Sequence, residues 1–448
     1  MRGRSGLILA GLVAVSGYCR EVRAQNSDRF YLSGDAALQG GAITANVRGG
    51  GGIWYNPASL ADLPGLRLDV DMTAYALSTG AQPDLDAISP DAEVTRLTTL
   101  DLRGVPAAMS VTHNVGPFGI GFGLFVPTQT SSYLRTRIVD PEAFAGKPVD
   151  FGVDITSTET EYFGGPSIGT RLSSTVSIGL SLLAHYRSEL QIAAIDLTGG
   201  GSSAPDFGYL SHTVRDWIQV GFQPVIGVQL QPKPTWKIGI TLRFPSFRIY
   251  QVLQTIELVS QQSPGENLHR SDFSDNTGFA TSIVKPPRIH VGISKDFGET
   301  RLAVEGSYQA PFRNLEVEQD LRPLWNFRVG GRHRFSDTFA LGGGLFTNLS
   351  ANRAATEFGE KQIDFYGVTL AGHLGSPYEV QSRGGKPLWP LGKLLFGTTI
   401  GLTYAFGAGT IVRGKIGIDP SNGDLFRPVP QNVFAHEIML SLGSSIEE

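Results

Sequence analysis

Charge is scarce in this sequence. Only 17% of its 448 residues are Asp, Glu, Lys or Arg, while 41% are hydrophobic. A soluble domain typically carries about 25% charged residues, so an ordinary soluble surface does not fit this composition. The net charge is −4 and no block of Lys and Arg occurs. These features exclude a nucleic-acid footprint and a polybasic membrane patch.

Long hydrophobic runs are also missing, apart from a short one near the N-terminus. A helix needs about 20 consecutive apolar residues to cross a bilayer, so the sequence excludes membrane-spanning helices. A chain can still present an apolar surface to lipid if every second residue of each strand faces outward. The 56 glycines suit strands whose other face is small or polar.

The single cysteine, Cys19, lies in a segment typical of a secretory signal. A basic start precedes the apolar residues 6–17, and the small-residue pattern at 22–24 predicts cleavage before Gln25. The mature chain then has no cysteine, which avoids disulfide errors in an oxidising periplasm. A lipoprotein acylated at Cys19 is the alternative, although Tyr18 before it fits that processing poorly.

Alternation of apolar with small or polar residues fills much of the remaining chain. In residues 236–244, five apolar side chains share one face, and Lys237, Gly239, Thr241 and Arg243 share the other. Residues 118–126, 175–182 and 218–230 repeat the pattern. Because side chains of a strand point alternately to its two faces, each segment has one apolar face.

Two folds can use this alternation, a soluble sandwich and a membrane barrel. The segments reach nine or more residues, whereas strands of soluble proteins usually have about 5–6, and a tilted strand crosses a bilayer in about 9–11. A soluble core would also have to bury charged side chains on the polar face. We therefore predict an all-β fold, a transmembrane antiparallel β-barrel. The charged residues at inward-type positions are Lys237, Arg243, Arg288, His290, Arg301, Glu305, Arg328 and Arg332.

The connections between these segments alternate in length, as in outer-membrane barrels with short periplasmic turns and long external loops. Counting from a first strand at 66–77 to a last at 434–442 gives about fourteen strands. External loops are expected at 79–97, 135–154, 198–210, 253–285, 313–323, 351–361 and 408–431. The link at 375–394 should be a short turn but is long, and its role is left open.

Residues 34–63 lack the alternation and are rich in small residues. We interpret them as part of a hatch inside the barrel lumen, because fourteen strands enclose a space that wall side chains cannot fill. In Trp54-Tyr55-Asn56-Pro57-Ala58, proline pushes Asn56 out of the helical region. Asn56 is then expected to bond to local backbone in a turn. The predicted division is a signal peptide at 1–24, the hatch at 25–64 and the barrel at 65–448.

The hatch segment resembles the N-terminal signature of the FadL/TodX family of outer-membrane transporters for hydrophobic compounds. The residues that carry the resemblance are Gly40-Gly41-Ala42, Ala45 and Trp54-Tyr55-Asn56-Pro57-Ala58-Ser59-Leu60, with segments of similar style at 166–169, 238–245 and 363–369. The resemblance implies a fourteen-stranded barrel, a hatch, and ligands such as long-chain fatty acids or aromatic hydrocarbons. It also implies sideways escape of ligand where the third strand is kinked. Unlike the family pattern, the chain ends in Ile446-Glu447-Glu448 without an aromatic residue.

Pro127 is the candidate for that kink, because it follows Val126 in the third counted strand and proline removes a ladder donor. The alternative is that Pro127 only ends the strand at the outer rim. Pro224, in the sixth strand, is a second such position.

The inward arginines Arg243, Arg301, Arg328 and Arg332, together with Glu305, allow two interpretations. They could form a ladder that braces the wall, since lumens of such barrels are polar. They could instead contact an anionic headgroup such as a carboxylate.

No pattern for catalysis or metal binding appears. The run at 49–52 lacks the Lys-Ser/Thr of a phosphate loop, and the eight histidines show no metal spacing. We predict a monomeric, non-enzymatic barrel in contact with outer-membrane lipids, without cofactor, that passes hydrophobic molecules by diffusion. The alternatives are a barrel of the same build that anchors secreted partners, and a general porin.

Overall fold

The computed structural model describes residues 31–63, 65–79, 85–87, 93–97, 105–144, 147–201, 204–263, 266–314, 319–353, 355, 360–378, 394–416 and 426–447. The signal peptide predicted at 1–24 lies outside the described residues, as do hatch residues 25–30 and most of the long link at 375–394. None of the described helices has the length and apolar character that a membrane-spanning helix needs.

Among the described residues, three short helices precede the strands: α2 (Gly34–Leu38), α3 (Gly51–Tyr55) and the 3₁₀ helix η1 (Pro57–Asp62). The first part of the sheet contains β1 (Arg67–Thr79), β2 (Leu85–Ala87), β3 (Glu93–Leu97), β4 (Val105–Val115), β5 (Phe118–Phe144), β6 (Lys147–Ser173), β7 (Val176–Gly201), β8 (Ala204–Lys233), β9 (Trp236–Arg243), β10 (Ser246–Ser263) and β11 (Glu266–Asp275). The remaining strands are β12 (Gly278–Lys285), β13 (Arg288–Phe297), β14 (Thr300–Gln309), β15 (Phe312–Asn314), β16 (Gln319–Leu321), β17 (Leu324–Ser336), β18 (Phe339–Asn348), β19 (Lys361–Tyr378), β20 (Leu394–Ile416) and β21 (Phe426–Glu447).

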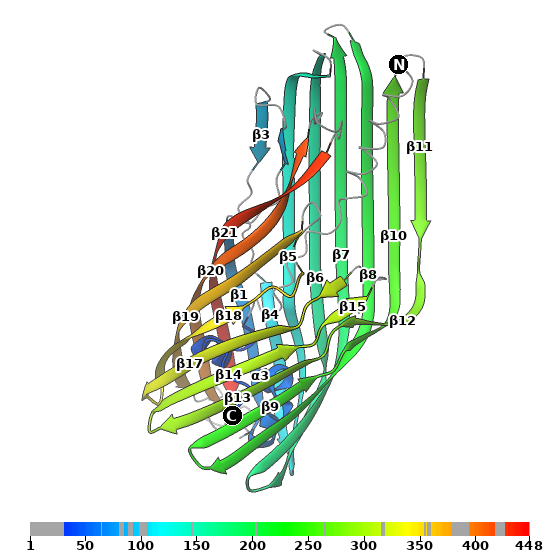
Figure 1. The fold of residues 1–448 in the computed structure, drawn as a ribbon. Helices are drawn as coiled ribbons and strands as arrows, with labels where there is room; N and C mark the ends of the chain where they lie inside the picture. Colours follow the sequence, from blue (N-terminus) through cyan, green and yellow to red (C-terminus); the bar gives the residue numbers. More distant parts are fainter. Residues whose placement is uncertain are drawn as a thin grey trace, which may run out of the picture.

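The strands close into a barrel of fourteen antiparallel strands, which confirms the predicted fold class (Figure 1). β9 with β10 forms one barrel strand, and β11, β12 and β13 form the next, because β9 pairs with β13 while β10 pairs with β11 and β12. β1 and β21 close the ring from Arg67↔Glu447 to Thr79↔His436. An Arg67–Glu447 ion pair of 2.8 Å lies at this seam. Closure matters because lipid cannot satisfy the N–H and C=O groups of an open edge.

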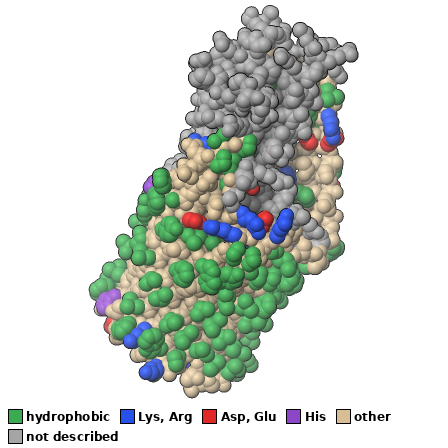
Figure 2. Space-filling model, in the orientation of Figure 1, with side chains coloured by type: hydrophobic (Ala, Val, Ile, Leu, Met, Phe, Trp, Pro, Cys, Tyr) green, Lys and Arg blue, Asp and Glu red, His purple; other side chains and the backbone are tan. Residues whose placement is uncertain are grey.

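Apolar side chains face outward and small or polar ones face the lumen. On β19, Leu370 is 68% exposed and its neighbour Thr369 is 0% exposed. Figure 2 shows apolar side chains spread over the visible barrel face, with charged groups near its ends. Outward apolar residues and buried polar ones are the reverse of a soluble sandwich, so the surface is one that hydrocarbon covers.

A row of tyrosines crosses the outer face of neighbouring strands. Tyr162, Tyr186, Val220 and Tyr250 are successive partners on β6, β7, β8 and β10. Tyr186 lies about ten residues from the start of β7, and about ten residues is the length that a strand needs to cross the bilayer. Aromatic residues typically line the interface between the bilayer and water. The row therefore marks the outer boundary of the membrane.

Several predicted loops are strands instead. The connections expected at 135–154, 198–210 and 253–285 are largely occupied by β5 to β8 and β10 to β12. Of these strands, β5 to β8, β10 and β11 continue past the tyrosine row as a tall wall on one side (Figure 1). The prediction of a loop at 135–154 was wrong because this part of β5 and β6, together with its partner in β7, has an apolar inner face that strand pairing buries. Its buried residues include Phe151, Val153, Ile155, Ile195 and Leu197.

Val304→Arg tests the orientation of the wall. Val304 is exposed near the middle of β14, so an arginine there faces the bilayer midplane and should cost about 2–4 kcal/mol of unfolding free energy. Thr300→Arg, beside the periplasmic turn, should cost only about 0–1 kcal/mol. Reversible denaturation in lipid vesicles measures both, and equal costs would contradict the assigned orientation.

Candidate functional site

The described hatch, residues 31–63, is packed inside the barrel. Most of its side chains are buried, including Ile43, Ile53 and Leu60. Ser33 caps α2, because its Oγ accepts a hydrogen bond of 3.2 Å from Ala36 N. The carboxylate of Asp69, on β1, accepts one of 2.8 Å from Gly50 N before α3. Wall side chains thus satisfy free amides of the hatch.

Asn56 joins the two halves of the hatch to the wall. Its Oδ1 accepts from Ala58 N at 3.1 Å, while its Nδ2 donates to Thr44 O at 2.8 Å and to Val228 O at 3.2 Å. The side chain is fully buried and caps η1, with Pro57 in the first position of that helix. The Asn-Pro-Ala turn is therefore a junction and not only a local turn.

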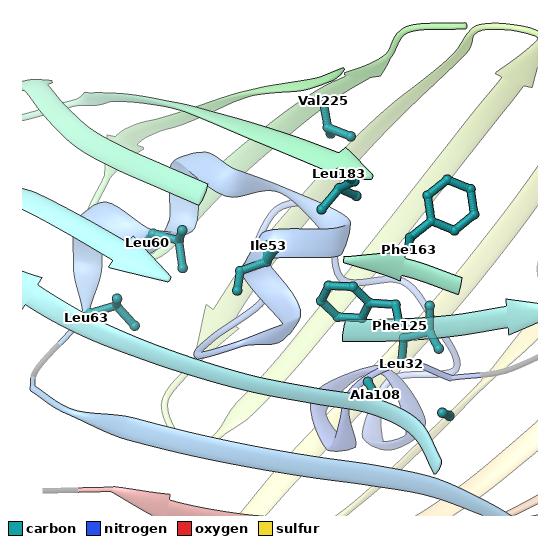
Figure 3. Close-up of a cluster of buried hydrophobic side chains, with 10 residues drawn as sticks. Leu32, Ile53, Leu60, Leu63, Ala108, Phe125, Phe163, Leu183 and Val225 are labelled. Atoms are coloured by element: carbon teal, nitrogen blue, oxygen red, sulfur yellow. The ribbon is translucent and has the colours of Figure 1, made fainter. Parts of the chain in front are cut away.

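Trp54 and Tyr55 pack toward the wall above this turn. The Trp54 ring lies 5.3 Å from that of Phe125 and 5.4 Å from that of Phe163, and the Arg243 guanidinium lies 3.8 Å from its centroid. Thr241 Oγ1 donates to Tyr55 O at 2.7 Å. Figure 3 shows Ile53, Leu60 and Leu63 of the hatch among Phe125, Phe163, Leu183 and Val225 of the wall.

Glycines in the wall let the hatch backbone touch the sheet backbone. A Cβ added to Gly119 would lie 1.7 Å from Leu60 O, and one added to Gly330 would lie 1.9 Å from Gln39 O. Similar overlaps with hatch atoms occur at Gly169, Gly179, Gly227, Gly239 and Gly342. These seven glycines, here called the glycine ring, lie on β5, β6, β7, β8, β9, β17 and β18. No wall side chain separates hatch from barrel at these points, so the lumen is tightly filled there.

A cavity of about 60 Å³ lies between the hatch and the wall. Its aromatic lining includes Tyr31, Trp54, Tyr55, Phe163 and Phe346. Its basic side chains are Arg243, Lys285, Arg288, His290 and Arg328. It has room for about two waters at the density of the liquid.

The four predicted arginines lie in two separate places. Arg243 and Arg328 border the cavity, where Arg243 donates to Trp54 O and Arg328 Nη1 lies 3.4 Å from Glu305 Oε1. Arg301 and Arg332 lie in a separate polar pocket near the periplasmic turns. There Arg301 Nε pairs with Asp296 at 2.5 Å, and Arg332 pairs with the hatch residue Asp35 at 3.3 Å. Of these four arginines, Arg243 and Arg328 border the cavity and Arg301 and Arg332 do not.

Two hatch carboxylates are held by cations. Burial alone would raise the pKa of Asp35, but Arg332, Arg67 and Arg48 together hold that pKa below its ordinary value. Burial would likewise raise the pKa of Asp62, but the ion pairs of Asp62 with Arg171 and Lys237 outweigh the effect of burial and lower that pKa. Both hatch carboxylates are therefore ionised at neutral pH, and their ion pairs persist there.

Pro127 lies at an irregularity of β5. The pairing of β5 with β6 shifts register between Phe125 and Thr128, so Val126 and Pro127 form a bulge. On the other edge of β5, the described pairs with β4 end at Phe125 and those with β3 begin at Arg135. Pro127 and Thr128 also line the cavity. By contrast, Pro224 faces Leu182 within a continuous β7–β8 ladder.

Sequence reasoning missed an ionic cluster on the inner wall above the cavity. Lys285 pairs with Glu161, and His185 Nε2 lies 3.6 Å from Glu161 Oε1. The His185 ring stacks on Phe163 with 4.3 Å between centroids, and its Nδ1 lies 2.7 Å from Ser246 Oγ. The inward position of Glu161 was readable from the alternation. Its partners were not, because Lys285 lies 124 residues away. Within the described residues, no cluster of His, Cys, Asp and Glu could hold a metal ion.

Neither a protein-family model nor a curated protein sequence matches the chain, but solved structures do. A Pseudomonas aeruginosa FadL homologue superposes with a TM-score of 0.59 at 14% identity, covering 93% of this chain and 98% of that chain. The CymD monoaromatic hydrocarbon channel superposes with a TM-score of 0.53 at 14% identity, covering 93% of this chain and 97% of that chain. The Ralstonia pickettii toluene transporter TbuX superposes with a TM-score of 0.52 at 13% identity, covering 94% of this chain and 99% of that chain. The chain is similar to these proteins in fold, that of a FadL-type outer-membrane barrel, as the hatch signature predicted.

Gly227→Ala tests the seat of the hatch. The new Cβ would lie 2.1 Å from Asn56 Oδ1, so the Asn-Pro-Ala turn must shift, at roughly 1–3 kcal/mol for overpacking. We expect a less stable protein with a higher ion conductance in planar bilayers. Gly306→Ala is the control, because its Cβ would meet only the Phe327 ring at 3.6 Å. Native conductance and stability in Gly227→Ala would contradict a tight seal.

Proposed function

We propose that this protein passes hydrophobic small molecules across the outer membrane by diffusion through its hatched barrel. The observation that carries the proposal is the aromatic and cationic cavity, which lies directly on a hatch that fills the lumen. A filled lumen argues against an open porin for polar solutes. The similar solved structures are described as hydrocarbon channels and toluene transporters, which supports transport and a non-enzymatic role.

The chemistry of the cavity favours a ligand with an acidic head over a neutral hydrocarbon. Five cationic or ionisable nitrogen side chains border it, while the aromatic rings offer apolar contact. A carboxylate gains charge-assisted hydrogen bonds from such groups. Of the two expected ligand classes, long-chain fatty acids therefore fit this lining better than aromatic hydrocarbons.

A route to and from the cavity is part of the proposal. On the outer side, the inner face of the tall wall is apolar, with Phe151, Val153 and Ile195 buried on it. On the exit side, the bulge at Pro127 lies beside the cavity, where β5 has no described partner on one edge between its pairs with β4 and β3. A ligand could leave there sideways into the bilayer. Because ligand pockets commonly measure about 300–1,000 Å³, Trp54 or the hatch must first shift.

Thr128→Trp tests the cavity as the ligand site. Thr128 borders the cavity, so an indole there should fill it and reduce saturable binding of labelled laurate to the purified protein at least tenfold. Ser188→Trp, on the outer face above the tyrosine row, should bind as the native protein does. Equilibrium binding with unlabelled laurate, dodecanol and toluene as competitors measures the preference.

The competing functions give other results. Maltose flux in vesicles without saturable laurate or toluene binding would identify a porin. Absence of both activities together with a co-purifying secreted protein would identify an anchor. Laurate binding that is unchanged in Thr128→Trp would remove the cavity from the proposal.

A further inference from the structure

One buried carboxylate connects the hatch to the cavity. Glu305 lies on β14 and is 2% exposed. Its Oε2 accepts hydrogen bonds from two hatch amides, Ile43 N at 3.0 Å and Thr44 N at 2.9 Å. Its Oε1 lies 3.2 Å from His290 Nδ1 and 3.4 Å from Arg328 Nη1. One oxygen therefore holds the hatch and the other faces Arg328 and His290 of the cavity wall.

The hatch segment that Glu305 holds, residues 43–45, is also bound on its opposite side. Thr44 O accepts from Asn56 Nδ2 at 2.8 Å, so the amide of Thr44 is bound by the wall and its carbonyl by the Asn-Pro-Ala turn. Behind it the wall is bare, since a Cβ added to Gly239 would lie 2.1 Å from Thr44 O. If the Glu305 carboxylate moved away, the amides of Ile43 and Thr44 would lose their hydrogen bonds to β14.

The same two side chains are within reach of a ligand in the cavity. His290 and Arg328 both line the cavity, so an anionic group that enters must share them with Glu305. A second negative charge repels the carboxylate, and a buried carboxylate that loses cationic partners is strongly destabilised. Its hydrogen bonds to the hatch amides weaken for the same reason, because they depend on its negative charge.

We propose that Glu305 is a positioning residue that latches the hatch, and that an acidic ligand head releases the latch by competing for Arg328 and His290. This inference rests on the proposed function for the identity of the ligand, but the latch itself does not. Neutral hydrophobes would occupy the cavity without releasing residues 43–45. The hatch then opens in response to the head group, whereas the apolar tail contributes affinity alone.

A cysteine at Thr44 reports the latch. Thr44 is 1% exposed and its Oγ1 has no described partner, so Thr44→Cys changes little, and the predicted mature chain has no other cysteine. We expect slow maleimide labelling of Thr44→Cys in the folded, purified protein. Adding Glu305→Gln should speed labelling at least tenfold without any ligand, which corresponds to about 1.4 kcal/mol.

The matched control is Glu189→Gln in the Thr44→Cys background. Glu189 is a buried carboxylate paired with Arg187 at 2.7 Å on β7, and we expect slow labelling in this variant. Heat-modifiable electrophoretic mobility verifies that each barrel is folded. Slow labelling in folded Glu305→Gln, or equally fast labelling in Glu189→Gln, would overturn the latch.

The ligand arm tests release. Laurate should speed labelling of Thr44→Cys, dodecanol should not, and laurate should have no further effect once Arg328→Gln is added. Acceleration by dodecanol equal to that by laurate would overturn release by the head group. If laurate does not bind at all, the proposed function fails, while the result for Glu305→Gln still decides whether Glu305 is a latch.

Discussion

The structure depends on direct contact between two backbones, that of the hatch and that of the wall. Wherever the glycine ring meets residues 38–60, a methyl group would overlap hatch atoms. Hatch and barrel therefore pack as one body, and interiors packed to this density do not deform continuously. A solute cannot slip between them, so passage requires either a discrete movement of the hatch or an opening in the wall. The cavity, the bulge at Pro127 and the contacts of Glu305 are all features of this contact zone.

The scarcity of charge in the sequence has a structural explanation. The outer face of the barrel meets hydrocarbon, where an arginine at the midplane costs about 2–4 kcal/mol, so the few charges lie in the lumen or beyond the membrane. Inside, many are paired across the hatch boundary, as Arg332 is with Asp35, and Arg171 and Lys237 are with Asp62. The Arg332–Asp35 pair is mostly buried, with side chains 20% and 13% exposed, so truncating one member leaves a poorly solvated charge. Arg171 is 54% exposed, and its pair with Asp62 is correspondingly weaker. The charged side chains thus hold the hatch in position as well as making the lumen polar.

Alternation predicted the barrel and its two faces well, because a period of two residues follows from strand geometry alone. The length of the strands was misjudged at 135–154 and 253–285. These stretches extend beyond the membrane, and from the sequence alone they resemble polar loops because the face that points inward is not known. The Asn-Pro-Ala turn was found by its composition, but the bond from Asn56 to Val228 spans 172 residues and has no local signal. The partners of Arg301 and Arg332 were unpredictable for the same reason. From the sequence, Gly119 indicates only a strand face of small residues. The need for glycine there follows from the position of the Leu60 carbonyl, which the sequence does not show.

The seam between β1 and β21 also constrains how the molecule is made. Its partners are separated by nearly the whole chain, from Arg67 to Glu447, and contacts so distant in sequence form late. The hatch precedes β1 directly and is synthesised before any strand of the ring. While the seam is unpaired, the curved sheet can assemble around residues 31–63. The hatch is thereby enclosed during assembly and never has to be threaded through a finished cylinder.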